Sequence, residues 1–269
     1  MKKIAIITLV SLLSFGVIAQ QKHHKSKSRS GGGTKHGVKS TGSLFMDFGL
    51  KGMAGSSVFI NSNLFEDNSY NHGFTSSYAF GGKFALDFGE HAALVVEGLY
   101  GVIGQNFNIT DSLNGDWTKA IKLKSIDIPI LLRKNNPETG SYAEIGPQIS
   151  LMNGYTESPS TTVNSFSKNY WSMVFGFGGY LWGTDNFGIS TGLRFVYTFQ
   201  DIMDQDVSNQ GSPTSGYIGG SFWENAVSYD TYQKTTPLSV FFVLEANYDL
   251  GFIIAKNECT GRRKFLFYN

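Results

Sequence analysis

The chain has 269 residues, a formal net charge of +1 and one cysteine, Cys259. A single cysteine excludes an internal disulfide framework, so the stability of the fold has to come from backbone pairing and packing. The charge is unevenly distributed: the first 42 residues hold eight of the 22 Lys and Arg residues and no acid, so the rest of the chain has a net charge of −7.

The first 19 residues have the pattern of a secretory signal peptide. Lys2 and Lys3 precede a mainly apolar run, residues 4–19, that ends on small residues and is too short for a spanning helix. Residues 20–42 follow with six Lys or Arg among Gly and Ser, which predicts a disordered, basic periplasmic tether. No later apolar stretch reaches the roughly 18 residues that a membrane helix needs, so any membrane crossing has to be made by strands.

Eight segments alternate between bulky apolar residues and polar or small residues. In residues 43–52 every second position is apolar: Leu44, Met46, Phe48 and Leu50. The same period of two recurs in residues 76–88, 94–101, 125–133, 142–151, 171–180, 192–199 and 238–248. A period of two indicates strands with one apolar face, and their lengths are close to the roughly 9 to 11 residues of a tilted membrane strand.

The connections between these segments alternate in length. Tight turns at Gly89-Glu90, "KNNPETG" and "GTDN" separate connections of about 23, 14, 16 and 35 residues, the pattern of outer-membrane barrels with short periplasmic turns and long outer loops. We therefore predict an all-β fold: an eight-stranded antiparallel up-and-down transmembrane β-barrel over residues 43–252. Both termini are expected in the periplasm, with residues 253–269 as a C-terminal periplasmic tail.

The alternation places several charged residues on the face that a closed barrel turns inward. An eight-stranded barrel leaves an interior just wide enough for side chains, and acids are much less costly there than facing lipid. We therefore predict a lumen charge network: Asp47, Lys83, Asp87, Glu97, Asp127, Glu144, Arg194 and Glu245. Lys51 and Arg133 are expected near the barrel ends, as partners for the spare acids. An acid–base site and an ion path are the alternatives to a salt-bridged plug.

The longest connection carries a group of aromatic residues that predicts a partner-binding loop. The group comprises Tyr217, Phe222, Trp223, Tyr229 and Tyr232. Tyr and Trp dominate the hot spots of protein interfaces, although the same residues also suit a barrel rim or an aromatic girdle.

Other motifs are weaker indications of chemistry. A calcium site is not predicted at Asp201, Asp204 and Asp206, because their spacing lacks the glycine and the terminal acid of an EF-hand loop. No metal site is predicted at His23, His24 and His36 either, because these residues lack Cys or carboxylate partners. His72, beside a loop serine, is the one candidate for an enzyme site at the outer rim. The glycine-rich "GFGGYLWG" lies within a strand, where the inward Gly176 and Gly178 make room for bulky neighbours.

Four segments resemble the PorT-like outer-membrane β-barrel family of Bacteroidota. They read "SIDIPILLRKN", "SYAEIGPQISLMNG", "NYWSMVFGFGGYL" and "GLRFVYTFQDI", with weaker agreement over residues 43–252. The resemblance implies an integral eight-stranded barrel and, in one branch of the family, an accessory role in protein secretion.

The leading functional hypothesis is a non-enzymatic structural or interaction barrel of the outer membrane, without a cofactor. Its expected partners are outer-membrane lipid and other envelope or secretion-system proteins, and no nucleic acid. A narrow ion or small-solute pore is the alternative, and an outer-membrane enzyme is the third hypothesis.

Overall fold

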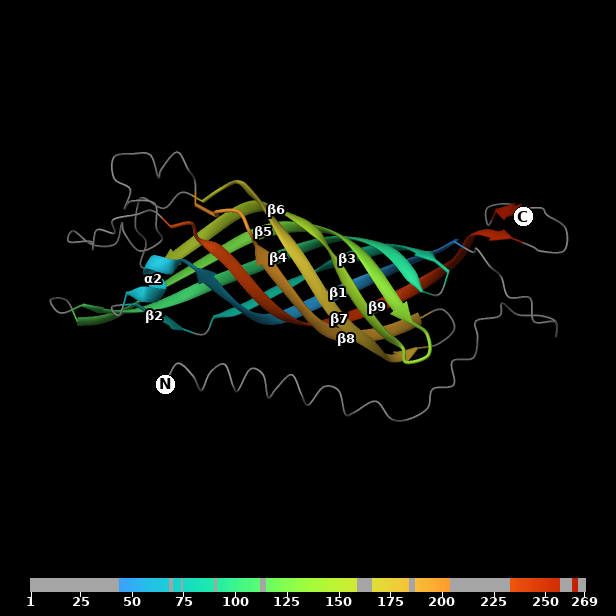
Figure 1. The fold of residues 1–269 in the computed structure, drawn as a ribbon, viewed down its shortest axis with the longest axis horizontal. Helices are drawn as coiled ribbons and strands as arrows, with labels where there is room; N and C mark the ends of the chain where they lie inside the picture. Colours follow the sequence, from blue (N-terminus) through green and yellow to red (C-terminus); the bar gives the residue numbers. More distant parts are fainter. Residues whose placement is uncertain are drawn as a thin grey trace. The chain divides into compact units, whose positions relative to one another are not determined.

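A computed structural model describes residues 44–67, 70–73, 75–89, 91–111, 115–158, 166–183, 187–203, 233–256 and 263–265. Within these ranges ten strands form one antiparallel sheet, and eight of them close into a ring (Figure 1). The ring strands are β1 (Leu44–Ile60), β3 (Ser76–Phe88), β4 (Ala92–Asp111), β5 (Gly115–Asn136), β6 (Ser141–Ser158), β7 (Asn169–Gly183), β8 (Phe187–Thr198) and β9 (Thr236–Lys256).

The ring is an up-and-down barrel, because each strand pairs with its neighbours in the chain and β1 pairs with β9. That closing seam is continuous from Phe48↔Tyr248 to Ile60↔Thr236, so the sheet has no open edge there. The predicted fold class, an all-β eight-stranded antiparallel barrel, is confirmed.

The two ends of the barrel differ. At the turn end, β3 is joined to β4 through Gly89 and β5 is joined to β6 through Gly140; both glycines have a positive φ, 72° and 68°, a conformation that glycine adopts without strain. At the loop end lie the short helix α2 (Ser62–Glu66) and β2 (Tyr70–Gly73), which pairs with β4 (Figure 1). No helix in the described ranges is long and apolar enough to cross a membrane.

One predicted loop is wrong, and the predicted end of the barrel differs from the observed one. The predicted connection between the third and fourth segments, residues 102–124, is largely a hairpin, in which β4 and β5 stay paired from Val102↔Lys124 to Asp111↔Gly115. At the other terminus β9 continues to Lys256, past residue 252, and β10 (Arg263–Phe265) pairs with its last residues.

The outward face of the barrel is apolar. On β7 every second side chain is a large, exposed apolar residue: Trp171, Met173, Phe175 and Phe177. On β5 the outward Ile126, Ile130 and Leu132 are likewise exposed, between Lys124 on one side and Lys134 on the other. Water-soluble barrels bury such side chains, whereas a barrel in lipid presents them.

The lumen is filled in layers that recur from strand to strand. From the loop end, β5 directs inward Ile121 and Leu123, then Asp127, then Leu131 and finally Arg133; all five are buried. The same order holds on β7, β8 and β9. There a hydroxyl layer (Ser172, Thr198, Ser239) is followed by an apolar layer (Val174, Val196, Phe241, Val243) and then by Gly176, Arg194 and Glu245.

Candidate functional site: a closed ring of charges in the lumen

Six buried charged side chains from six strands form a closed ring of ion pairs across the lumen. In order around the ring they are Lys51, Glu97, Arg194, Glu144, Arg133 and Glu245, after which Lys51 follows again. Bases and acids alternate, so this charge ring has no net charge. Its side chains are at most 3% exposed, which means that the ring spans the barrel interior and is shielded from solvent.

Each acid of the charge ring is held by at least two bases. Arg194 donates to both oxygens of Glu97 (Nη1–Oε2 2.6 Å, Nη2–Oε1 2.9 Å), and Lys51 binds the same carboxylate. Such bidentate, charge-assisted hydrogen bonds are the strongest kind in proteins and fix geometry as well as charge.

Glu144 and Glu245 are held in the same way on the other side of the lumen. Glu144 accepts from Arg194 (Nε–Oε1 3.0 Å) and from Arg133 (Nη2–Oε2 2.8 Å). Glu245 accepts from Arg133 (Nη1–Oε1 2.9 Å), and its other oxygen lies 2.9 Å from Lys51 Nζ. All three acids therefore have full ionic partners despite their burial.

A second, smaller ion pair is attached to the charge ring. Lys83 Nζ lies 2.6 Å from Glu245 Oε1 and 3.5 Å from Asp47 Oδ1, so it links the ring to an acid nearer the turn end. The addition of Lys83 and Asp47 leaves the cluster neutral. Tyr142 packs against the same end, with its ring centroid 4.4 Å from Arg133 Cζ.

Two inward glycines make room for the large side chains. A Cβ at Gly176 would lie 2.8 Å from both Cγ and Oε1 of Glu144, and one at Gly178 would lie 2.7 Å from the Tyr142 hydroxyl. The expectation that Gly176 and Gly178 accommodate bulky neighbours is confirmed. β7 thus takes part in the charge ring by leaving space for it.

The eight residues that the sequence assigns to the lumen network are not all brought together. Glu97, Glu144, Arg194 and Glu245 are in the ring, and Lys83 and Asp47 adjoin it. Asp87 is half-buried at the turn end, opposite Phe45 of β1. Asp127 lies apart from the other charges, among hydroxyl groups.

Lys51 and Arg133 are members of the charge ring that the sequence places near the ends of the barrel. Both occupy inward positions of their strands, and their side chains are 0% and 3% exposed. Their period-two position was a sufficient signal that they face the lumen. Their partners depend on how the strands are staggered, which the spacing along one strand does not reveal.

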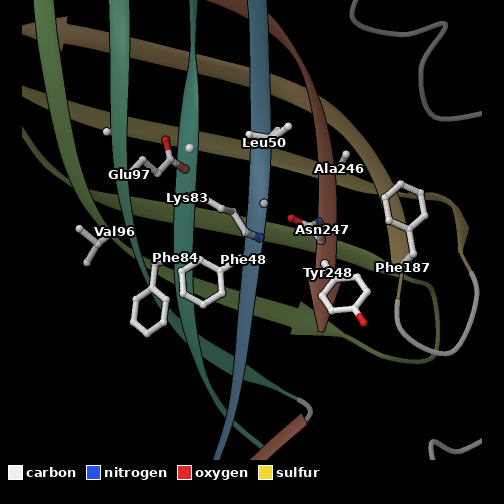
Figure 2. Close-up of a pocket in the computed structure, with 13 residues that line it drawn as sticks. Phe48, Leu50, Lys83, Phe84, Val96, Glu97, Phe187, Ala246, Asn247 and Tyr248 are labelled. Carbon is white, nitrogen blue, oxygen red and sulfur yellow. The ribbon is translucent and has the colours of Figure 1, made fainter. Parts of the chain in front are cut away.

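The outer wall of the barrel carries an open hollow of about 750 Å³ between β1, β3, β4 and β9 (Figure 2). Its floor includes the small residues Gly82, Gly98 and Ala246. Bulky apolar side chains surround the floor: Phe48, Leu50, Phe84, Val96, Phe187 and Tyr248. Since Lys83, Glu97 and Asn247 are buried on the lumen side of this wall, the hollow offers hydrocarbon contacts and no charged group.

Comparison with known proteins finds similarity in solved structures only. No protein-family model and no curated protein matches the chain. The chain is similar to the outer membrane protein OprG from Pseudomonas aeruginosa (10% identity, 78% of this chain, 97% of that chain, TM-score 0.43). It is also similar to Neisserial surface protein A (11% identity, 74% of this chain, 95% of that chain, TM-score 0.38). A third similar structure is Ail, the attachment invasion locus protein of Yersinia pestis (11% identity, 78% of this chain, 99% of that chain, TM-score 0.35). Membership of the PorT-like family stays a prediction.

The loop end is closed by an apolar cluster, which we call the apolar seal. It combines inward strand residues with residues of the connections: Phe59, Leu64, Phe107, Ile121, Leu123, Phe166, Tyr170, Ile202 and Met203. His72, the candidate for an enzyme site, lies beside it, stacked on Phe65 (ring centroids 4.2 Å apart) and edge-on to Phe107 (5.4 Å). Its contacts with these rings are those of a packed side chain.

Asp201, the first acid of the possible calcium motif, organises the backbone of its connection. Its Oδ1 accepts hydrogen bonds from the backbone N–H groups of Met203 and Thr235, both at 3.1 Å. Asp204 and Asp206, the three tether histidines and the aromatic residues from Tyr217 to Tyr232 lie outside the described residues. Within the described part of the chain no group of three or more His, Cys, Asp or Glu residues could hold a metal ion.

Proposed function

We propose that the protein is an integral outer-membrane β-barrel with a non-enzymatic, structural or interaction role in the cell envelope. The ring of strands leaves no backbone edge at its seam, which is a requirement for a sheet in hydrocarbon. The outward face supplies the apolar surface that lipid would cover.

The height of this apolar surface supports the proposal. On β5 the outward positions are charged at Lys124 and Lys134 and apolar between them. Ten residues of strand span about 33 Å, which at a tilt of about 40° is a height of about 25 Å, the height of the apolar band of outer-membrane barrels. The two lysines are thus spaced to reach the two membrane interfaces.

We propose the turn end for the periplasm and the loop end for the cell surface, as the connection lengths predict. With eight spanning strands both ends of the barrel segment, at β1 and β9, lie at the turn end, and the preceding tether and the following tail are then periplasmic.

The filled lumen is the single observation that favours an interaction role over the narrow pore. The charge ring crosses the interior, and the apolar seal closes the loop end. Hydrated ions need a continuous polar path, and two closures in series interrupt it. We therefore rank the pore second. The third hypothesis, an enzyme, rests on His72, whose described surroundings are aromatic rings.

The finer proposal is that the barrel assists protein secretion. Its support is the resemblance of four strand segments to the PorT-like family, in which one branch has this role. The connection with Trp223 and the segment after β9 are the parts that we propose for contacts with other envelope proteins.

The test is to cross-link native outer membranes mildly, purify the protein in detergent and identify stoichiometric partners by mass spectrometry. Recovery with secretion or assembly proteins is the expected result. A matched variant, Trp223→Ser with Tyr229→Ser, should lose the partner while the barrel still shows a heat-dependent shift in gel mobility. Recovery as a single species at all cross-linker concentrations would contradict the interaction role.

A further inference from the structure

Asp127 is a buried acid that has no cationic partner in the described structure. It is 8% exposed, and none of the ion pairs between described lumen residues includes it. Arg133, the ring member on the same strand, is six residues away, or about 20 Å along the strand. The lumen charges therefore do not neutralise Asp127.

The immediate neighbours of Asp127 are neutral oxygen groups. Ser125 Oγ donates to Asp127 Oδ1 (2.8 Å), and Ser150 also hydrogen-bonds the carboxylate. Gln148 donates from Nε2 to Ser150 Oγ (3.1 Å). The Asp127 carboxylate occupies the space where a Cβ at Gly101 would lie. Several hydroxyl and amide groups thus surround the carboxyl group of Asp127.

An enclosed cavity of about 20 Å³ adjoins this carboxylate. Its polar lining consists of Asp127, Gln148, Tyr170, Ser172, Thr198 and Ser239. Ser172 and Thr198 hydrogen-bond each other (2.8 Å), so one of these two oxygens is an acceptor from the other. A cavity of at least about 10–15 Å³ holds one water-sized guest, so this one has room for a single small occupant.

The cavity is closed on both sides by apolar layers. Toward the loop end lies the apolar seal, to which Tyr170 itself belongs; toward the charge ring lie Val174, Val196, Phe241 and Val243. An ionised carboxylate in such surroundings is strongly disfavoured unless it is paired. Either a proton on the carboxyl group or a positively charged occupant of the cavity would neutralise it.

We propose that this cavity is a binding site for one monovalent metal cation of the size of Na⁺. Asp127 supplies the single negative charge, and the neutral ligands are oxygens of Gln148, Ser172, Thr198 and Ser239. A divalent ion is disfavoured by charge: one carboxylate would leave a net positive charge between apolar layers, whereas Ca²⁺ sites usually contain several acidic oxygens. The site depends on the barrel fold and not on the proposed partner role.

The test is the Na⁺ dependence of unfolding in detergent at constant ionic strength, with NaCl replaced stepwise by choline chloride. Above the dissociation constant, the unfolding equilibrium constant of the wild type should fall about tenfold for each tenfold rise in Na⁺, since the ion binds only the folded state. Asp127→Asn should show no Na⁺ dependence. In choline chloride alone it should be at least as stable as the wild type, because it buries no unpaired charge.

Two further variants keep the test decisive. Thr198→Val keeps the charge but removes one ligand, so it should need a higher Na⁺ concentration for the same stabilisation; it also replaces Asp127→Asn if that variant fails to fold. Glu138→Gln, at the exposed β5–β6 turn, should behave like the wild type. An equal Na⁺ dependence in wild type and Asp127→Asn would mean that Na⁺ acts elsewhere on the protein, and no dependence in either would mean that the cavity holds water or that Asp127 holds a proton. Either result would overturn the proposal.

Discussion

Arg194 is the residue on which the charge ring depends most. It is fully buried and joins Glu97 to Glu144, two acids from different strands. Buried ion pairs add little net stability compared with apolar residues of the same volume. The loss of one partner, however, leaves the remaining charges unpaired in a medium of low polarity. The ring is therefore tolerant of neutral replacement as a unit and intolerant of single changes.

Replacement of Arg194 by Met should lower the free energy of unfolding by about 3–5 kcal/mol, because it leaves two buried acids with one base fewer. Urea-induced unfolding in detergent micelles measures the loss. The double variant Arg194→Met with Glu144→Gln removes one charge of each sign and should recover part of it. Lys122→Met, at an exposed position of β5, is the control; an equal loss there would show that the ring has no special role.

Gly176 and Gly98 form a matched pair of glycines on opposite faces of the wall. Gly176→Ala places a Cβ 2.8 Å from Glu144, whose carboxylate is held by two arginines, whereas a Cβ at Gly98 meets nothing within 4 Å. The first change should destabilise the barrel by about 1–3 kcal/mol through overpacking. Gly98→Ala should be neutral or slightly stabilising, since it reduces the conformational freedom of the unfolded chain. Thermal unfolding of the two variants side by side would show this difference; equal midpoints would contradict it.

At the scale of the element, each strand has to present an apolar outward face and fit a crowded lumen with the other. β5 does so with Ile126, Ile130 and Leu132 outward and with Asp127, Leu131 and Arg133 inward. A shift of one residue in register would exchange the two faces. The register of β5 is therefore specified by its own side chains as well as by its pairing with the neighbouring strands.

A charge on the outward face of β5 should prevent stable insertion. Ile130→Lys, near the middle of the apolar band, should lower stability in lipid vesicles by about 2–4 kcal/mol, because a lysine there lies far from either interface. Folding into vesicles, followed by the heat-dependent gel shift, measures the effect. Glu138→Lys adds the same group at an exposed turn and should insert normally; insertion of both variants alike would argue against membrane embedding.

The sequence predicts the strands of this barrel well because the outward and lumen faces differ in polarity at successive positions. Each of the eight predicted segments overlaps a different ring strand, and two of the predicted turns coincide with Gly89 and Gly140. Residues 102–124 were missed because that hairpin extends beyond the apolar band, where the polar Asn106, Asn108 and Thr118 weaken the alternation. Polarity marks a strand only where the two environments differ.

The contacts of the lumen charges were less predictable than their direction. Alternation shows that Lys51 and Glu97 face inward, but their contact across the lumen, from β1 to β4, follows from the stagger and tilt of the strands. For the same reason Asp127 was grouped with charges that lie in another layer. The positions of all eight strands along the barrel axis are needed to separate Asp127 from the residues of the charge ring.

On the scale of the whole molecule, the lumen is closed at several levels. The apolar seal blocks the loop end with side chains from β1, β4, β5, β7, α2 and the connections, and the charge ring blocks the interior nearer the turn end. The two closures differ chemically: the apolar seal is built of apolar side chains, and the charge ring fills the space with paired charges. A conducting path would have to pass both.

The wild-type barrel should therefore show no current steps in planar bilayers. A single substitution in either the apolar seal or the charge ring should not produce them. Arg194→Ala removes the central base of the charge ring but leaves the apolar seal, and Phe107→Ala thins the seal but leaves the ring. The double variant should not conduct either, because the apolar layer with Val174, Val196, Phe241 and Val243 still lies between the thinned seal and the charge ring. Circular dichroism and the heat-dependent gel shift check the fold of each variant. Steps from the wild type would reverse the ranking of interaction barrel and pore, and steps from Arg194→Ala alone would show that the apolar seal is open in the membrane.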